Sequence, residues 1–381
     1  MKALIIGCGI GGPATAMALQ RAGIEAEVFE AYPASAEGVG AFLNVASNGL
    51  DALRVLGAHR KVMAAGIPTP HMVMWSGTGK RLGEVANGLA LEDGTVSHTI
   101  LRSDLYRVVR DEAVSRGVPI TYGKRLVDFE DTGDKVVARF EDGGEAVGDI
   151  LIAADGVRSR IRHLLDPQAP EPRYSGLYSL GGIVHDAGFA GEPGVYNMIF
   201  GKRAFFGYTV TRTGDAWWFA NLPRALGDVP ADWKPVLLEA FADDAGSAAE
   251  LIERSRVDGG LPVHDLPPVP TWHRGRVVLT GDAAHATSPS AGQGASLAIE
   301  DGIVLARCLR DSAGHREAFE RFEAERRGRV ERVVAYSRTI SNGKAAGPVA
   351  RVFRDLALPF FLKKTASQES LAWMYRHHVA L

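Results

Sequence analysis

Residues 2–12 read KALIIGCGIGG, an apolar run followed at once by a glycine-rich turn. Residues 13–22 then have helical composition and spacing, so the expected order is strand, tight turn, helix. In this order Gly7 permits the turn, Gly9 lets the backbone approach a pyrophosphate, and Gly12 allows the helix to pack closely on the strand. The stretch therefore predicts the first strand and helix of a parallel sheet that binds a dinucleotide.

Glu30 ends the next predicted strand, Glu25–Glu30, roughly 20 residues after the glycines. A carboxylate at this position can accept hydrogen bonds from both hydroxyls of an adenosine ribose, while the N-terminus of the helix offers N–H groups to the phosphates. These features do not separate NAD from FAD. The rest of the chain has to identify the dinucleotide.

The composition favours a globular, two-domain protein that acts on small molecules. The chain has 381 residues, of which 46% are hydrophobic, which is enough for substantial cores. Its 43 basic and 45 acidic residues are interspersed, so no broad electrostatic field would recruit nucleic acid or an anionic membrane. A core strand is expected from residue 3 onward, and no apolar run approaches the ~18 residues needed to span a bilayer. We therefore expect a cytoplasmic protein with no stable membrane insertion.

Residues 173–267 contain short aromatic and β-branched runs separated by Gly and Pro, which is typical of a region of strands. The expected strands are 182–185, 195–200, 204–210 and 216–222, and the expected helices are 237–242 and 248–254. Residues 276–280 then form a buried strand of the parallel type, so the first domain is discontinuous. The expected domains are a nucleotide-binding domain at 1–68, 101–172 and 268–340, a substrate domain at 69–100 and 173–267, and a C-terminal helical segment at 341–381.

Two local predictions concern the region between these domains. A helix is expected to start near Leu101, with Ser103 as its N-cap, and to end near Gly117. Residues 135–140 and 149–153 flank a glycine turn and are expected to belong to a small antiparallel meander.

A second glycine-rich stretch lies far along the chain, where residues 281–294 read GDAAHATSPSAGQG and residues 298–302 read AIEDG. Residues 292–295 lie just before a predicted helix. Their N–H groups and the positive end of that helix can therefore face a negatively charged group.

Three separated matches resemble the FAD-dependent aromatic hydroxylases, the class A flavoprotein monooxygenases of the para-hydroxybenzoate hydroxylase fold. They are Gly7–Gly12 with Glu30, the Asp155-Gly156 loop, and Gly281–Gly294. Together with the order of domains, the resemblance covers nearly the whole chain. It implies an α/β protein with a Rossmann-type FAD-binding domain, an inserted β-sheet substrate domain and C-terminal helices.

The resemblance also implies roles at the cofactor. Asp282 would accept a hydrogen bond from the ribityl chain of FAD, Arg102 would approach the ribityl and phosphate region, and Glu30 would bind the adenosine ribose. The alternative for Asp282 is a helix N-cap. The implied FAD-binding residues are Gly7, Gly9, Ile10, Gly11, Gly12, Glu30, Arg102, Asp155, Gly281, Asp282, Gly292, Gln293, Gly294 and Ala295.

The implied reaction is a hydroxylation. NADPH or NADH would bind transiently in a surface groove and reduce FAD, because the chain has no second Rossmann motif. Reduced flavin would then react with O₂ to form a C4a-hydroperoxide, which transfers one oxygen atom to a small aromatic or heteroaromatic substrate. Arg158 and Arg162, after the Asp155 loop, are either phosphate contacts or solvated surface charges.

Pro289, Arg203 and Tyr208 form the implied catalytic set. Pro289 would line the reaction pocket beside the flavin, unless it merely shapes a loop. Residues 201–210 loosely resemble a segment of the FAD-dependent urate hydroxylases in which an arginine, matching Arg203, holds the substrate. Alternation along this strand puts Tyr208 and Phe205 on opposite faces.

Two departures from the urate hydroxylases favour a phenolic or heteroaromatic substrate other than urate. Trp217-Trp218 stands where a tyrosine would be expected, and Ser290 follows Pro289 where an acidic residue would be expected. Further candidate pocket residues, each explained equally well by core packing, are Tyr178, His185, Tyr196 and Trp217.

No metal site is expected. His285 matches a position used for packing and for hydrogen bonds on the cofactor side, so it is not expected to act as a base. His377 and His378 are adjacent and point in different directions. The spacing of Cys8 and Cys308 suits neither a metal nor a redox pair.

Three alternative functions share parts of this fold. One is a flavin-dependent halogenase, although Trp217-Trp218-Phe219 lacks the Trp-x-Trp-x-Ile-Pro spacing expected of that class. The second is an FAD-dependent reductase of isoprenoid double bonds. The third is a non-catalytic flavin-bound accessory protein, which would show no substrate-stimulated oxidation of NAD(P)H.

Overall fold

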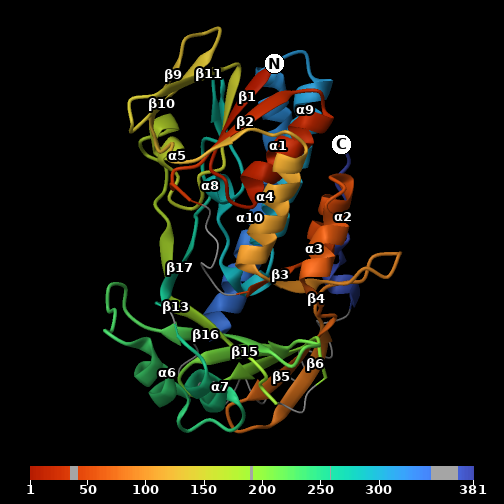
Figure 1. The fold of residues 1–381 in the computed structure, drawn as a ribbon, viewed down its shortest axis with the longest axis vertical. Coiled ribbons are helices and arrows are strands. Elements are labelled where there is room, and N and C mark those ends of the chain that lie inside the picture. The colour runs from red at the N-terminus through yellow and green to blue at the C-terminus, as the bar shows by residue number, and fades with distance from the viewer. Residues whose placement is uncertain (35–41, 189–191, 258, 345–367) are drawn as a thin grey trace.

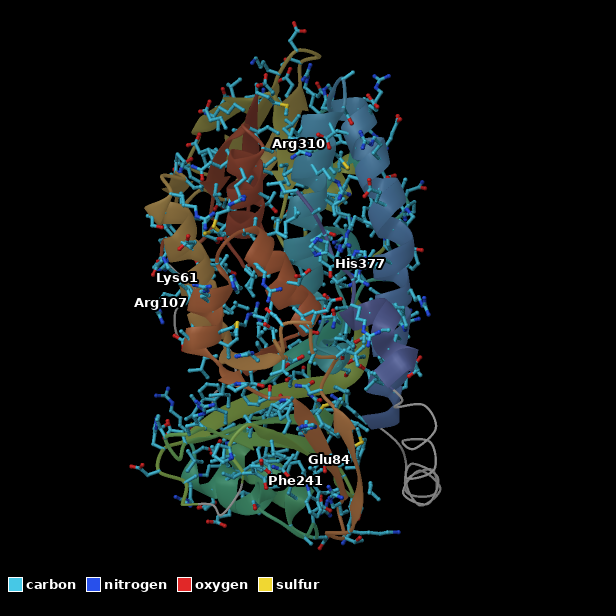
Figure 2. The ribbon with its side chains drawn as sticks, turned by 90° about the vertical axis from the view of Figure 1, so that its right-hand side faces the viewer. Lys61, Glu84, Arg107, Phe241, Arg310 and His377 are labelled. Atoms are coloured by element: carbon cyan, nitrogen blue, oxygen red, sulfur yellow. The ribbon has the colours of Figure 1, made fainter. Side chains whose placement is uncertain are left out.

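The computed structural model describes residues 1–34, 42–188, 192–257, 259–344 and 368–381, so part of the expected C-terminal segment lies outside the described residues. Two sheets lie at opposite ends of the long axis of the molecule, and helices cover both (Figure 1). Figure 2 places Phe241 in the lobe of the larger sheet and His377 in the other lobe, beside the long helices. No helix in the described ranges is long and apolar enough to cross a membrane.

The first sheet has six strands, and all of its neighbouring pairs are parallel except the one at one edge. Its order is β18 (His273–Arg274), β19 (Val277–Leu279), β12 (Ile150–Ala153), β1 (Lys2–Ile6), β2 (Glu25–Phe29) and β8 (Ile120–Thr121). The helices that pack with it and with one another include α1 (Gly11–Arg21), α4 (Arg102–Ser115) and α9 (Gly294–Asp311). This is the Rossmann-type α/β fold predicted from the sequence.

The turn between β1 and α1 requires glycine at two positions. Gly7 has φ +109°, and a Cβ on it would lie 2.3 Å from the carbonyl oxygen of Ala154. A Cβ on Gly12 would lie 2.0 Å from the carbonyl oxygen of Gly7. Any larger residue would separate α1 from the strand end. A Cβ on Gly9, in contrast, would meet no described atom within 4 Å, which leaves this part of the turn open to a ligand.

Two local predictions are wrong in part. The antiparallel meander consists of β9 (Leu126–Asp131), β10 (Val136–Phe140) and β11 (Glu145–Gly148), whereas β12 pairs in parallel with β1 and β19. A continuous apolar run such as β12 is typical of a strand buried on both faces. Ser103 is not an N-cap, because α4 already begins at Arg102 and Leu101 occupies the cap position without a side-chain bond.

The second sheet has seven strands and carries two helices on one face (Figure 1). Its order is β17 (Leu261–Asp265), β13 (Arg173–Val184), β16 (Ala216–Pro223), β15 (Phe205–Val210), β14 (Val195–Phe200), β5 (His71–Ser76) and β6 (Arg81–Ala86). Helices α6 (Trp233–Phe241) and α7 (Ala248–Arg254) bury Phe206, Trp218 and Phe241 against one another. Residues 71–86 thus join a sheet that otherwise comes from residues 173–265.

A small sheet and one long helix connect the two ends. The small sheet has the order β3 (Phe42–Val45), β7 (His98–Leu101) and β4 (Ile67–Pro68), and it lies with α2 (Ser47–Val55) and α3 (His59–Ala65) between the larger sheets (Figure 1). Helix α10 (His315–Lys344) packs along α9 and ends against β16, where Lys344 bonds to Asn221. Residues from both larger sheets can therefore line a cavity between them.

Candidate functional site

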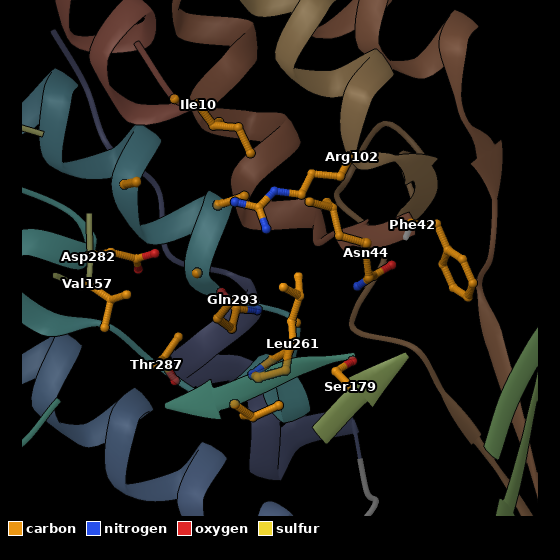
Figure 3. A pocket seen from close by; sticks show the side chains of 18 of the residues that line it. Ile10, Phe42, Asn44, Arg102, Val157, Ser179, Leu261, Asp282, Thr287 and Gln293 are labelled. Atoms are coloured by element: carbon orange, nitrogen blue, oxygen red, sulfur yellow. The ribbon is translucent and has the colours of Figure 1, made fainter. Parts of the chain in front are cut away.

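A cavity of about 3330 Å³ extends from the Gly7 turn to the second sheet. It is several times larger than a pocket for one drug-sized ligand, so it has room for a dinucleotide and a second molecule. Figure 3 shows Arg102 and Asp282 pointing into it from opposite sides, with Ser179 of β13 and Leu261 of β17 at its other end. Every implied FAD-binding residue lines this cavity except Gly12, which lies behind the turn.

Glu30 holds the glycine turn and faces the cavity. Its Oε2 accepts a hydrogen bond of 2.7 Å from the backbone N–H of Cys8, and its Oε1 accepts one of 3.0 Å from that of Tyr32. Each carboxylate oxygen has a second lone pair. The Glu30 carboxylate can therefore still accept hydrogen bonds from the two hydroxyls of a ribose, the role expected from the sequence.

Asp282 begins the short helix α8 (Asp282–His285), whose N-cap is Gly281, so Asp282 is not itself the cap. Its side chain is exposed to the cavity (Figure 3). Desolvation by the surrounding protein raises the pKa of its carboxyl, although His285 and Arg102 act in the opposite direction. A hydrogen-bond donor on a ligand would therefore find a poorly hydrated acceptor at this place.

Asp155 lies at the cavity wall, at the start of α5 (Arg160–Leu165). Its Oδ2 accepts a hydrogen bond of 3.2 Å from the N–H of Ile161, whereas its Oδ1 is buried and has no hydrogen-bond partner among the described residues. Burial raises the pKa of this carboxyl, and the nearby Ser159 partly offsets the effect. An unsatisfied buried acceptor is unfavourable, and a ligand donor or a water in the cavity would satisfy it.

The two arginines after this loop differ. Arg158 is exposed and lines the cavity. Arg162 is fully buried and donates to the carbonyl oxygens of Ala283, at 3.1 Å, and Val157, at 2.9 Å. Arg162 is therefore neither the phosphate contact nor the solvated charge that the sequence suggested; it ties α5 to α8.

A buried ionic network fixes the loops around Gly281 and Gln293. Asp301 accepts a hydrogen bond from the N–H of Gly281 at 2.8 Å, and the same carboxylate lies 2.6 Å from Nε2 of His285. Its other oxygen accepts a bond of 2.7 Å from Nε of Arg326 on α10. His285 is thus a packing and hydrogen-bonding residue, as expected. The network couples the loop to two helices.

Glu300 extends the network toward the cofactor loop. It pairs with Arg326 and with Arg329, each at 2.8 Å, and accepts a bond of 2.7 Å from Asn48, which also bonds to Gln293 at 3.0 Å. Burial by itself would raise the pKa of Glu300, but the two arginines outweigh it and lower the pKa to about 2. For Asp301, too, the neighbouring His285 and Arg326 outweigh burial and lower the pKa to about 2.

Serines anchor the loop that carries Pro289. The Ser337 hydroxyl of α10 donates to the carbonyl oxygen of Ser288 at 2.8 Å and accepts from the N–H of Ala291 at 3.1 Å. The Ser290 hydroxyl lies 2.8 Å from that of Ser341. Sequence reasoning missed these contacts and the arginine network, because α10 is a long, highly charged segment whose composition suggests an exposed helix. Pro289 lines the cavity on this anchored loop.

The second sheet presents aromatic rings to the cavity. The ring of Phe219 lies 5.9 Å from that of Phe205 and 5.8 Å from that of Phe42, measured between centroids. A Cβ on Gly207 would lie 2.2 Å from the Phe219 ring, so the absence of a side chain at Gly207 leaves room for this ring. The cavity-lining aromatic residues of this end are Phe42, Tyr196, Phe200, Phe205 and Phe219.

Arg203 and Tyr208 do not line the cavity, which corrects their implied catalytic role. Arg203 donates to the carbonyl oxygens of Glu239 and Ala240 at the end of α6. Tyr208 packs with the core under α6 and α7. The predicted alternation is right, but the face that looks into the cavity is the one with Phe205. Sequence periodicity defines two faces and does not say which one meets the other domain.

The remaining candidates divide evenly. His185 and Tyr196 line the cavity, whereas Tyr178 and Trp217 do not. Tyr178 is buried under α6, and its hydroxyl accepts a hydrogen bond from the N–H of Gly227. Trp217 lies behind Phe42, with 6.2 Å between ring centroids.

The described residues contain no group of His, Cys, Asp and Glu side chains that could hold a metal ion. His378 pairs with Asp51 at 2.6 Å, and His377 lies 4.0 Å from Glu300, so the two histidines have different partners. Both cysteines are buried.

Comparison with known proteins identifies relatives over nearly the whole chain. The family model described as "FAD binding domain" matches residues 1–337. The chain is 34% identical over 345 residues to the aurachin C monooxygenase/isomerase of Stigmatella aurantiaca, covering 88% of each chain. It is 31% identical over 353 residues to an FAD-dependent urate hydroxylase of Klebsiella pneumoniae, covering 90% of this chain and 91% of the relative.

A solved structure has the same fold. The crystal structure of Klebsiella pneumoniae HpxO complexed with FAD and uric acid superposes with a TM-score of 0.88 at 28% identity, covering 98% of this chain and 97% of the other.

Proposed function

The chain belongs to the FAD-binding-domain family of flavin-dependent hydroxylases, and from this we propose which residues serve the cofactor and which substrate the enzyme takes. The protein is an FAD-dependent monooxygenase, an oxidoreductase whose relatives act on aromatic and heteroaromatic compounds. We propose NADPH or NADH as the electron donor. The halogenase, reductase and accessory-protein alternatives have no comparable support.

The glycine turn and Glu30 are proposed to hold the adenosine half of FAD. The open side of Gly9 lets phosphates approach, and the backbone N–H groups at the start of α1 would bind them there. Asp282 and Arg102 are proposed to bind the ribityl region from opposite sides of the cavity. The N-terminus of α9, which follows Gln293, would stabilise negative charge on the reduced flavin.

When bound, FAD would supply the chemistry: hydride acceptance from the reduced nicotinamide and activation of O₂, with one oxygen atom entering the substrate and the other leaving as water. The chain contributes the surroundings. Its aromatic end would exclude water from the reaction space, and the serine bonds to α10 hold the Pro289 loop at the cavity wall. The ionic network around Asp301 keeps the loop of Asp282 in place.

One observation carries the substrate proposal: the cavity that begins at the glycine turn ends on the aromatic rings of the second sheet. Flat rings stack well on such surfaces. We propose a phenolic or heteroaromatic substrate other than urate, because Arg203, the arginine expected to hold urate, lies on the far face of the sheet.

A compound screen tests the proposal. Purified, FAD-loaded enzyme is mixed with NADPH or NADH and a panel of phenols, hydroxypyridines and quinolones, and nicotinamide oxidation is followed with and without each compound. We expect at least one compound to stimulate oxidation and to gain one oxygen atom by mass spectrometry. Stimulation without an oxygenated product would identify an uncoupled ligand. Absence of stimulation by every ring compound, with the flavin bound, would favour the accessory protein.

A further inference from the structure

Lys344, the last residue of α10, brings a cation to the aromatic end of the cavity. Its Nζ donates a hydrogen bond of 3.0 Å to Oδ1 of Asn221 on β16. The same Nζ lies 4.4 Å from the ring centroid of Phe205 and 5.5 Å from that of Phe219. All four of these residues line the cavity.

The contacts of Lys344 leave its charge incompletely compensated. An ammonium group has three N–H donors, of which Asn221 receives one. Burial lowers the pKa of Lys344 to about 7, and no described carboxylate acts against this shift. Lys344 is half-buried, and a partly desolvated cation without an anionic partner among the described residues is unfavourable. The faces of Phe205 and Phe219 compensate part of this cost.

Other charged residues also line the cavity. Arg254 and Arg256 lie at the end of α7, and Arg254 bonds to Glu250 and to the carbonyl oxygens of Asp186 and Ala187. Glu30, Arg102, Asp155 and Asp282 lie with the first sheet and its loops. Lys344 lies over the rings of Phe205 and Phe219, which face the cavity from the second sheet.

We propose that Lys344 selects the substrate: its Nζ pairs with an anionic oxygen on the substrate ring, while the ring itself packs on Phe205 and Phe219. This inference rests on the proposed function and narrows it to ring compounds that carry a carboxylate or a phenolate. Asn221 acts as a positioning residue, because it fixes the direction of the ammonium group without a charge of its own. An anion at this place would supply the partner that the ammonium lacks among the described residues.

The test measures binding rather than turnover, so it does not depend on the reaction. FAD-loaded wild type, Lys344→Met and Lys344→Arg are compared by equilibrium dialysis with two matched pairs of probes. Benzoate is matched with neutral benzamide, and para-nitrophenolate with neutral para-nitroanisole. Lys80→Met is the control variant, because Lys80 is an exposed lysine in the turn before β6.

We expect wild type to bind at least one anion more tightly than its neutral partner. Lys344→Met should raise the dissociation constant of that anion roughly 10-fold or more, which corresponds to the about 1.5–3 kcal/mol of a charged hydrogen bond. The dissociation constant of the neutral probe should change by less than about threefold. Lys344→Arg should retain most of the preference, and Lys80→Met all of it. A loss confined to benzoate or to para-nitrophenolate identifies the anionic group.

Two results would overturn the inference. One is the absence of any preference for an anion in wild type, and the other is an equal loss of charged and neutral probes in Lys344→Met, which would indicate a purely structural lysine. Both are distinct from failure of the proposed function, which would appear as an absence of ligand-stimulated NAD(P)H oxidation whatever the binding preference.

Discussion

The two ends of the cavity are built by different physical means. At the end formed by the glycine turn and the start of α9, here called the nucleotide end, the backbone at Gly9 lies open. Asp301 and Glu300 anchor the surrounding loops through buried ion pairs. At the substrate end, side-chain rings from separate strands form the wall, and Lys344 supplies a charge. Backbone geometry demands particular residues at particular spacings, whereas a wall of rings can be made by many sequences. Sequence motifs therefore identify the first end of the cavity but not the second.

The difference also predicts how each end responds to mutation. Removing one member of a buried ionic network leaves its partners charged and desolvated, which affects the whole fold. Removing one ring from a cavity wall enlarges the cavity and leaves the fold nearly intact. Five changes test this contrast, in order of decreasing size.

Arg326→Met should have the largest effect. It leaves Glu300 and Asp301 buried without their shared arginine, so the free energy of unfolding should fall by about 3–5 kcal/mol. Urea denaturation of the FAD-loaded protein measures the change. Arg310→Met is the control, because the pair of Arg310 with Asp311 is exposed and should matter little. Equal midpoints for the two variants would contradict the contrast.

Acid should weaken the same network. The folded-state pKa values of Glu300 and Asp301, about 2, lie below the ordinary values of 4.5 and 3.8, so their stabilising contribution is complete above about pH 4.5 and is lost as the pH falls toward 2. The difference in thermal midpoint between wild type and Glu300→Gln should therefore shrink over this range. A difference that stays constant from pH 4.5 to 2 would show that the carboxylate charge is not responsible.

Asp282→Ala should release the cofactor without unfolding the chain. We expect the dissociation constant of FAD to rise roughly 10- to 100-fold, because a charged hydrogen bond contributes about 1.5–3 kcal/mol. Asp282→Asn keeps an acceptor but no charge, so its dissociation constant for FAD should lie between those of wild type and the alanine variant. Flavin fluorescence on titration with FAD gives both constants. Unchanged FAD affinity in the alanine variant would remove Asp282 from the cofactor site.

Phe219→Ala should affect the substrate end alone. Loss of this ring should weaken the binding of an aromatic ligand by about 1–2 kcal/mol and uncouple NAD(P)H oxidation from oxygen transfer. The affinity for FAD should stay the same. Tyr208→Phe is the matched control on the opposite face of the sheet. If Tyr208→Phe uncouples the reaction as strongly as Phe219→Ala, the assignment of faces is wrong.

Arg203→Ala should have the smallest effect. Its guanidinium binds carbonyl oxygens at the C-terminal end of α6, where a cation contributes about 0.3–1 kcal/mol. Stability should drop by that amount, with KM and coupling unchanged. Initial rates and product yield with the substrate found in the screen check this. A raised KM would return Arg203 to the substrate site.

The motifs of the chain predicted the α/β fold. They also predicted a set of FAD-binding residues, and each of these except Gly12 lines the cavity. They failed at Arg203 and Tyr208, because alternation along β15 gives two faces of similar composition. They also gave no sign of Arg326 or Lys344. Both lie in α10, whose many charges suggest a solvated helix, yet Arg326 is 1% exposed.

Local sequence is enough to predict the strand, turn and helix of the nucleotide end, because a positive φ at Gly7 and the close approach at Gly12 tolerate no other residue. The folded structure is needed to show which face of the second sheet meets the cavity and which charged residues of α10 are buried. These choices depend on how separate elements pack against one another, and contacts between residues remote in the chain leave no local pattern in the sequence.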